Sequence, residues 1–252
     1  MLEGKTTIVT GAARGIGAAF ARAFADRGAS VVACDLRECE ETVETIRAAG
    51  GRAISASIDV TDLPSCERVA EFALAQYGRI DGLMNNAAMY GNLSSGSFES
   101  IDEDEWDACM RVNVKGLWHC AKVVVPAMRE QGGGSIVNIA SLAAIWGIPN
   151  ALHYSASKAG VIGFTRGLAR ELGRDNIRVN AIAPSLVDTP GTEEMVGEEN
   201  LERFQGVILD QQTLRRTMQP DDLVGMASFL VSDDSAFVTG QTLNVDGGWV
   251  YR

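Results

Sequence analysis

The sequence has little of what metal centres, disulfide frameworks and nucleic-acid surfaces require. It contains two histidines, His119 and His153, which lie far apart and give little support to a transition-metal site. Its five cysteines form no CxxC motif and lie in or beside apolar segments, which predicts buried free thiols in a reducing compartment. The net charge is −11 and no run of Lys or Arg occurs. Nucleic acid and anionic membranes are therefore not expected as partners.

Long apolar runs are also missing. No stretch of about 18 apolar residues occurs, and the N-terminus MLEGKTTIVTG does not have a basic segment followed by an apolar run of signal-peptide length. We expect a cytoplasmic protein without membrane contact. The chain of 252 residues is 46% hydrophobic and 22% charged, which is typical of a globular protein with a large core.

Seven short apolar runs recur along the chain. Runs of this length are typical of strands that are buried on both faces of a parallel sheet, and they cover 6–10, 30–34, 53–58, 80–84, 134–140, 177–183 and 242–246. Helical periodicity lies between several of them, at 16–24 (closed by Gly28), 66–77, 104–128 and 155–172. This alternation predicts an α/β protein with a Rossmann-type doubly wound parallel sheet of about seven strands and helices on both faces.

The chain shows no linker, low-complexity tract or internal repeat, so we expect one dinucleotide-binding and catalytic domain over 1–252. One segment, 186–218, departs from the alternation because it is polar, contains glycine and is weakly periodic. Its place between the sixth strand and the next helix predicts a substrate lid.

A glycine-rich turn, TGAARGIG (10–17), joins the first predicted strand to the first predicted helix. Gly11, Gly15 and Gly17 let the backbone turn tightly and approach a ligand, and a helix N-terminus offers free N–H groups to phosphate. The spacing is GxxxGxG rather than the GxGxxG of the commoner dinucleotide fingerprint. In this context it predicts a dinucleotide site.

Asp35 at the end of the second predicted strand bears on the choice of dinucleotide. A carboxylate there can accept hydrogen bonds from the adenosine ribose and would repel a 2′-phosphate, although it could also be a solvated loop acid. Arg14 and Arg37 argue the other way, because a guanidinium could hold that phosphate. We give the position of Asp35 more weight and predict NAD rather than NADP.

The segment HYSASK (153–158) contains a tyrosine and a lysine four positions apart, Tyr154 and Lys158. On a helix this separation puts both side chains on one face, about a turn apart. By itself the pair could equally be the polar edge of an amphipathic helix.

Taken together, these motifs resemble those of the short-chain dehydrogenase/reductase family. TGAARGIG, NNA at 85–87, Asn113, Ser141 and Tyr154-x-x-x-Lys158 occur in the order and at the spacings of that family, and the likeness continues to VDGG at 245–248. It therefore covers essentially the whole chain.

The resemblance implies four catalytic residues. Tyr154 would exchange a proton with the substrate oxygen, and Lys158 would hold the nicotinamide ribose and lower the tyrosine pKa. Ser141 would orient the substrate oxygen, and Asn113 would support a water in the proton path. The alternatives are a buried helix asparagine at Asn113 and a turn-forming serine at Ser141. A lysine ammonium about 4 Å away supplies around 4 kcal/mol at an effective dielectric of about 20, which is enough for a shift of about two pKa units.

Cofactor and substrate contacts are implied in the same way. The expected cofactor residues are Gly11, Arg14, Gly15, Ile16, Gly17, Asp35, Leu36, Asp59, Val60, Asn86, Ala87, Ala88, Tyr154, Lys158, Pro184, Ser185, Val187 and Thr189. The expected substrate residues are Ser141, Leu142, Ala143, Trp146, Tyr154, Leu186 and Met195. We expect no metal. His153 is expected to be structural, and Trp106, Trp118 and Trp249 to serve in packing.

The chain departs from the family pattern at two positions. Ala88 and Ser185 stand where the family usually has glycine, and each adds a Cβ beside the cofactor cleft. The segment IAPSLVDT loosely resembles members that oxidise secondary alcohols, some with aryl or cyclic groups. Gly160, Gly163 and Gly167 interrupt the helix that begins near Tyr154, and this helix commonly forms a subunit interface in the family, so we predict a homotetramer.

Three functions are compatible with these residues. The favoured one is an NAD-dependent dehydrogenase that converts secondary alcohols reversibly to ketones. The second is an NADPH-dependent 3-oxoacyl thioester reductase, which Asp35 and the acidic composition disfavour because an acyl carrier protein is itself acidic. The third is a non-catalytic NAD-sensing protein, which would have no need of Asn113, Ser141, Tyr154 and Lys158.

Overall fold

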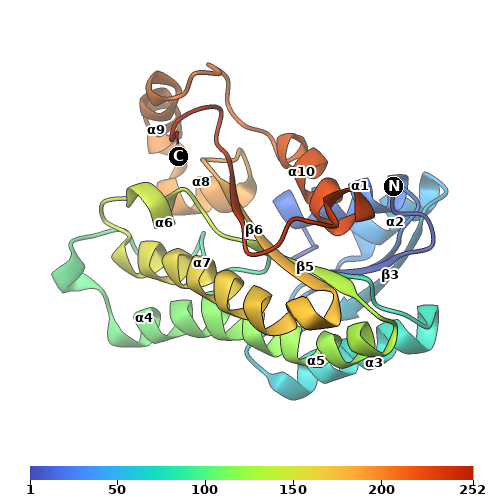
Figure 1. The fold of residues 1–252 in the computed structure, drawn as a ribbon. Coiled ribbons are helices and arrows are strands. Elements are labelled where there is room, and N and C mark those ends of the chain that lie inside the picture. Colours follow the sequence, from blue (N-terminus) through green and yellow to red (C-terminus); the bar gives the residue numbers. More distant parts are fainter. Residues whose placement is uncertain (252) are drawn as a thin grey trace.

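The computed structural model describes residues 1–251, and within them one seven-stranded parallel sheet forms the centre of the protein (Figure 1). The strands are β1 (Thr6–Thr10), β2 (Ser30–Asp35), β3 (Arg52–Ser57), β4 (Gly82–Asn85), β5 (Gly134–Ile139), β6 (Ile177–Pro184) and β7 (Thr242–Val245). Their order is β3-β2-β1-β4-β5-β6-β7. The chain winds outward in both directions from β1 and β4, so the doubly wound sheet predicted from the sequence is confirmed.

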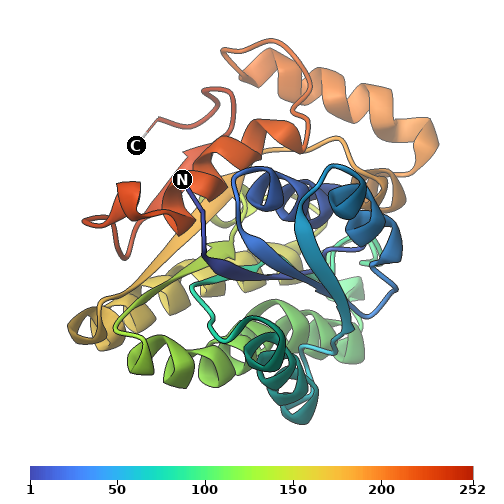
Figure 2. The same ribbon diagram turned by 90° about the vertical axis from the view of Figure 1, so that its right-hand side faces the viewer.

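Helices cover both faces of the sheet (Figures 1 and 2). The helices are α1 (Gly15–Asp26), α2 (Glu40–Ala48), α3 (Leu63–Tyr77), α4 (Glu103–Met110), α5 (Gly116–Glu130), α6 (Ala143–Trp146), α7 (Leu152–Leu172), α8 (Pro190–Val196), α9 (Glu198–Gln211) and α10 (Asp221–Val231). α1, α2 and α10 pack on one face around Phe20, Phe24 and Leu230, whereas α3, α5 and α7 pack on the other around Met128 and Ile136.

The end of α1 illustrates how the sequence sets a boundary. Gly28 follows the helix with φ +93°, a left-handed conformation that a side chain would strain, and its N–H donates to the carbonyl of Ala25. The predicted glycine stop is therefore confirmed.

Two segments differ from the sequence predictions. The periodicity at 104–128 predicts one helix, but α4 and α5 are separated by a π-helical turn, Arg111–Lys115. The weakly periodic segment 186–218 contains two helices, α8 and α9. Helix α8 begins where it does because Thr189 caps its first turn and Pro190 is its first residue.

Candidate functional site

The four predicted catalytic residues meet at the carboxyl edge of the sheet. Ser141 follows β5, Asn113 lies in the π-helical turn, and Tyr154 and Lys158 lie on the first turns of α7. The Ser141 hydroxyl acts on the Tyr154 phenol and favours a lower pKa for it, and the Lys158 Nζ lies 5.7 Å from the centre of the Tyr154 ring. Residues that are distant in sequence are thus brought together by the end of β5, the π-helical turn and α7.

Tyr154 is buried, with 8% of its surface exposed. Burial raises the pKa of its phenol well above the usual range, and the neighbouring Tyr90 adds to this, whereas the hydrogen bond from Ser141 acts in the opposite direction. The phenol is therefore protonated in this state. The lowering of the Tyr154 pKa by Lys158 stays a prediction for the cofactor-bound protein.

Lys158 is buried more deeply, with 3% of its surface exposed. Burial lowers the pKa of its ammonium group to about 8. Nζ donates one hydrogen bond, to the carbonyl of Ile139 at the end of β5, at 2.7 Å. An ammonium group has three N–H donors, so the remaining ones are available to a ligand at this edge.

The Asn113 side chain is fully engaged with the protein. Its Oδ1 accepts from the N–H of Met89 at 2.7 Å, and its Nδ2 donates to the carbonyl of Met89 at 3.1 Å and to Ser157 Oγ at 3.0 Å. The amide therefore links the segment after β4 to α7. Because both polar atoms of the side chain are used, a water at Asn113 would have to bind the backbone carbonyl of this residue. Asn113 lies in the π-helical turn, where backbone carbonyls are hydrogen-bonded differently from those of an α-helix.

The glycine turn fits a dinucleotide. No side chain of the described residues caps the first turn of α1, so its N–H groups face the carboxyl edge without an internal acceptor. A Cβ at Gly17 would collide with the carbonyl oxygen of Gly11, and a Cβ at Gly11 would lie 2.8 Å from Asn86 Nδ2. Asn86 also donates to the carbonyls of Thr10 and Gly11, at 3.0 and 3.1 Å, and so fixes the turn. The donor set and the close approach suit a pyrophosphate.

Asp35 is the last residue of β2 and contacts this turn. Its Oδ2 accepts from the N–H of Ala13 at 3.3 Å, and its Oδ1 accepts from the N–H of Arg37 at 3.0 Å. Arg14 points elsewhere, because its guanidinium makes two hydrogen bonds to the Glu194 carboxylate on α8, at 2.5 and 2.6 Å. No local pattern in the sequence indicates this ion pair.

The remaining predicted cofactor residues lie around the same edge. A Cβ at Gly15 would lie 3.5 Å from Thr189, so the start of α8 faces the glycine turn. Leu36 and Ala88 are exposed, Val60, Pro184 and Val187 are buried, and Ile16, Asp59, Ala87 and Ser185 are intermediate. The hydroxyl of Ser185 donates to the buried Gln212 at 3.2 Å, which gives the substituted position a structural partner.

The predicted substrate residues lie around Tyr154, although they are not all accessible. Leu142 and Ala143 are buried, whereas Leu186 and Met195 are partly exposed. Met195 packs in the apolar cluster that contains Tyr154. Tyr90, which the sequence analysis did not select, belongs to the same cluster, and its ring centre is 5.0 Å from that of Tyr154. Its position just after NNAA is the signal that could have identified it.

The other aromatic and histidine predictions have mixed outcomes. His153 is completely buried, and its Nε2 lies 2.7 Å from Glu105 Oε1, a contact that supports a structural role. Trp249 packs, as expected, but its partner is Trp146, with ring centres 5.1 Å apart. Trp118 does not fit the packing prediction, because 47% of its surface is exposed on α5.

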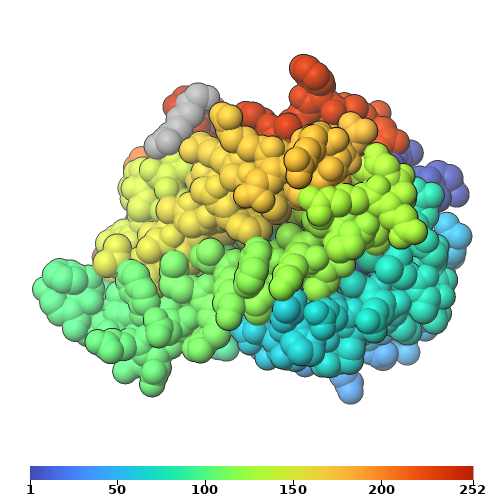
Figure 3. All heavy atoms as spheres, turned by 60° about the horizontal axis from the view of Figure 1, so that its bottom comes forward, coloured from blue at the N-terminus to red at the C-terminus, as the bar shows by residue number. Residues whose placement is uncertain are grey.

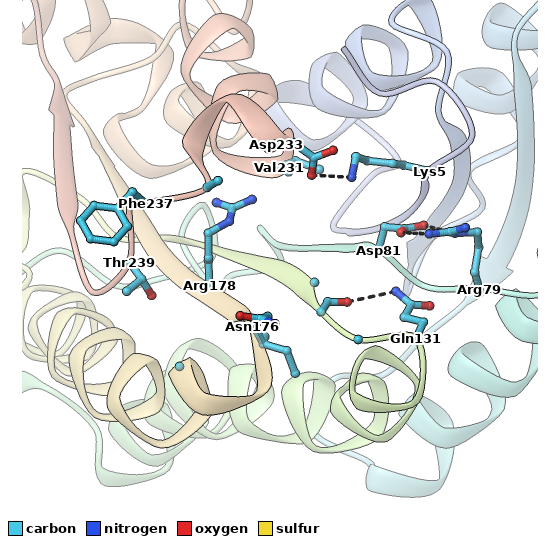
Figure 4. A pocket seen from close by; sticks show the side chains of 16 residues that line it. Lys5, Arg79, Asp81, Gln131, Asn176, Arg178, Val231, Asp233, Phe237 and Thr239 are labelled. Carbon is cyan, nitrogen blue, oxygen red and sulfur yellow. Dashed lines mark hydrogen bonds and ion pairs between the residues drawn. The ribbon is translucent and has the colours of Figure 1, made fainter.

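A hollow of about 770 Å³ lies at the opposite, amino edge of the sheet (Figure 4). Its charged groups already have partners: Lys5 pairs with Asp233 at 2.8 Å and Arg79 with Asp81 at 2.6 Å. Arg178 donates to two backbone carbonyls and to a serine hydroxyl. Ligands of doubly wound sheets bind beyond the carboxyl ends of the strands, so we assign the site to the Tyr154 edge.

Residues 1–251 contain neither a metal cluster nor a membrane-spanning helix. No cluster of three or more His, Cys, Asp or Glu side chains there could hold a metal ion. No helix in the same range is both long and apolar enough to cross a membrane.

Fold and site together define an oxidoreductase that uses a nicotinamide cofactor, and comparison with known proteins supports this class. Residues 11–250 match the family model described as "Enoyl-(Acyl carrier protein) reductase". The chain is 40% identical to 3-oxoacyl-(acyl-carrier-protein) reductase of Thermotoga maritima, with 99% of each chain covered. It is 35% identical to 7alpha-hydroxysteroid dehydrogenase of Bacteroides fragilis, covering 98% of this chain and 94% of that one.

Solved structures agree with these relatives. Levodione reductase superimposes with a TM-score of 0.90 at 31% identity and covers 98% of each chain. The chain therefore belongs to the short-chain dehydrogenase/reductase family, as the motifs predicted.

Proposed function

We propose that the protein is an NAD-dependent dehydrogenase that converts secondary alcohols reversibly to ketones. The observation that carries the proposal is the contact of Tyr154 with Ser141 and Lys158 beside the glycine turn. A protonated phenol hydrogen-bonded to a serine hydroxyl can hold and exchange the proton of a substrate oxygen. The nicotinamide supplies hydride acceptance and donation when bound.

The roles of the individual residues follow from their contacts. The Ser141 hydroxyl orients the substrate oxygen toward the Tyr154 phenol. In reduction the Tyr154 phenol gives its proton to the carbonyl oxygen, and in oxidation the phenolate, formed by loss of that proton to solvent, takes the hydroxyl proton. The Lys158 ammonium binds the ribose with the donors not used by Ile139, and its charge lowers the tyrosine pKa once the site is filled. The engaged Asn113 side chain positions α7 and leaves its backbone carbonyl to support a water.

Two contacts support NAD over NADP. The Asp35 carboxylate is fixed at the end of β2 by the N–H groups of Ala13 and Arg37, where it would repel a 2′-phosphate. Arg14, one of the two candidates for binding that phosphate, is held by Glu194 in a two-bond pair. Arg37 remains as the counter-argument, since its guanidinium could turn to the ribose.

A second candidate is a 3-oxoacyl thioester reductase. The 40% identity to the Thermotoga maritima 3-oxoacyl-(acyl-carrier-protein) reductase favours it. Asp35 and the net charge of −11 speak against it, because the acyl carrier is itself acidic.

A spectrophotometric assay distinguishes these candidates. NAD and NADP are each tested with a panel of secondary alcohols, and NADH and NADPH with ketones and 3-oxoacyl thioesters, by following the absorbance of the reduced nicotinamide. Turnover of alcohols with NAD supports the proposal, whereas a preference for thioesters with NADPH supports the second candidate. Tight NAD binding without turnover of any compound would instead indicate an NAD sensor.

The segment 186–218 is proposed as the lid of this site. Its helix α8 is joined to the glycine turn by the Arg14–Glu194 pair, and its Met195 packs near Tyr154. Opening of the lid would require this two-bond ion pair to break, so the pair stabilises the closed position.

We place the protein in the cytoplasm. We also propose that it forms a homotetramer, because one face of the protomer is open. A Cβ added at Gly163 or Gly167 of α7 would meet no atom of the described chain within 4 Å, and Trp118 is exposed on neighbouring α5. Figure 3 shows the surface over these two helices, in green and gold. Small residues on an exposed helix face allow a second subunit to approach closely. A monomer by light scattering at micromolar concentration would refute this assembly.

A further inference from the structure

The C-terminal residues 246–251 form a strap that is tied to the end of the proposed lid. Leu214 N–H donates to the carbonyl of Gly247 at 2.8 Å, and the Thr213 hydroxyl donates to the carbonyl of Gly248 at 3.0 Å. The carboxylate of Asp246 accepts from the N–H groups of Gly248 and Val250. These bonds hold the strap in one conformation and fix the backbone of Trp249 between them.

In this position the ring of Trp249 contacts the ring of Trp146. The ring centres are 5.1 Å apart and the planes are tilted by 54°, an arrangement that aromatic pairs favour. Trp146 nevertheless stays 54% exposed. A fixed aromatic pair with an open face is suited to stacking on a flat ligand, because its rings are already ordered before the ligand binds.

Trp146 lies on a helix that packs against the helix of the reacting tyrosine. Trp146 ends α6, the short helix that begins just after Ser141, and α6 packs against α7, which carries Tyr154 (Figure 1). Ile148, two residues further on, packs in the apolar cluster around Tyr154, and its N–H donates to the hydroxyl of Ser155 at 3.3 Å. A ligand whose oxygen meets Ser141 and Tyr154 would extend past this cluster toward the pair.

We infer that Trp146 and Trp249 form an aromatic subsite for a flat ring that the substrate carries next to its carbinol or carbonyl carbon. The substrate class is then ring-bearing secondary alcohols and ketones rather than small aliphatic ones. The inference rests on the proposed reaction at Tyr154. It also makes the C-terminal strap part of the substrate site, a role that the sequence did not predict for Trp249.

Two ketones that differ in ring content test the subsite, 2-tetralone with a fused ring system and 2-butanone without one. For Trp249→Ala and Trp146→Ala we expect kcat/KM with NADH to fall about tenfold for 2-tetralone and to stay within about twofold for 2-butanone. Trp249→Phe should recover most of the activity on 2-tetralone. Phe237→Ala, which removes an exposed aromatic side chain from the amino edge of the sheet, is the control and should change neither value.

Equal losses for the two ketones, or no loss for either, would overturn the subsite. If the unmodified protein reduces no ketone, the proposed function fails. The subsite is then tested by binding alone, with calorimetric titration of 2-tetralone into the NAD-loaded protein. Weaker binding in Trp249→Ala but not in Phe237→Ala would retain it, and unchanged or undetectable binding in all proteins would reject it. Near-ultraviolet circular dichroism checks that each variant is folded.

Discussion

The two edges of the sheet use charged residues in opposite ways. At the amino edge each charged group around the hollow has a partner, as in the pairs Lys5–Asp233 and Arg79–Asp81. At the carboxyl edge, Lys158 is buried with a single carbonyl acceptor, and its pKa is lowered to about 8 by that burial. The charges at the amino edge therefore neutralise one another, whereas the Lys158 ammonium at the carboxyl edge has N–H donors left for a ligand.

The difference shows why the presence of a hollow does not identify the active site. Charged groups that pair with one another stabilise loops and strand ends, and their ligand-binding capacity is already used. A buried cation without a carboxylate partner is costly to maintain and is expected where a ligand completes the interaction. Changes at the carboxyl edge should thus alter catalysis, and changes at the amino edge should alter stability.

The largest effect is expected from Tyr154→Phe, which removes the proton-exchanging hydroxyl and keeps the ring. We expect kcat to fall by about 10²–10⁴-fold, the range for loss of a general acid or base, while the NAD dissociation constant stays within about twofold. Steady-state kinetics and NAD titration measure both. Tyr77→Phe, at the end of α3, is the control, and retained turnover in Tyr154→Phe would disprove the assigned role.

At the amino edge, Arg178→Met should have the reverse effect. The substitution removes hydrogen bonds from a guanidinium to two carbonyls and a hydroxyl, and the free energy of unfolding should fall by about 2 kcal/mol. Urea denaturation measures this loss. The value of kcat should remain within about twofold of the unmodified protein, and a large decrease would mean that the two edges are not functionally separate.

Lys158 should make stability depend on pH. Its folded-state pKa is about 8 and its unfolded value is 10.5, so between these values the unfolded chain binds more protons and stability rises with pH. The Tyr154 pKa is raised, which opposes this trend only above about pH 10. From pH 8 to 10 we expect the unmodified, cofactor-free protein to gain about 2 kcal/mol relative to Lys158→Met.

Urea denaturation at several pH values tests this expectation. A difference between the two proteins that stays constant from pH 8 to 10 would show that Lys158 titrates normally and is not desolvated at the carboxyl edge.

The smallest effect is expected from Glu194→Gln, which releases Arg14. A free guanidinium near the glycine turn can bind a 2′-phosphate, so the ratio of kcat/KM for NADP to that for NAD should rise about three- to tenfold. Glu193→Gln alters the adjacent exposed glutamate of α8 and should leave the ratio unchanged. No change in Glu194→Gln would leave Asp35 as the sole proposed determinant of cofactor choice.

The sequence predicted those features that depend on local pattern. Continuous apolar runs located all seven strands because a strand buried on both faces needs apolar side chains in succession. Gly28 marked the end of α1 because its positive φ excludes most other residues. The motif residues Asn113, Ser141, Tyr154 and Lys158 were found by their spacing, and the structure brings them together.

Other features have no local pattern. The π-helical turn at Arg111–Lys115 continues an ordinary helical periodicity, so the sequence predicted one helix there. The position of Tyr90 after NNAA places it near the cleft, but its contact with Tyr154 depends on tertiary packing between two separate segments. Trp118 was expected to pack, but hydrophobic type alone does not indicate which helix face meets the core.

The sequence by itself determined the doubly wound sheet and the glycine turn, because each depends on residue type at fixed local spacing, and the resemblance of its motifs to the family pointed to Tyr154 as the proposed proton-exchanging residue. The tertiary structure decided which charges are paired and which remain open. Glu194 holds Arg14 across a large sequence separation, and the strap brings Trp249 to Trp146. Such contacts depend on how whole helices and loops are placed relative to one another. The apolar packing on the two faces of the sheet fixes this placement, and no short stretch of sequence encodes it.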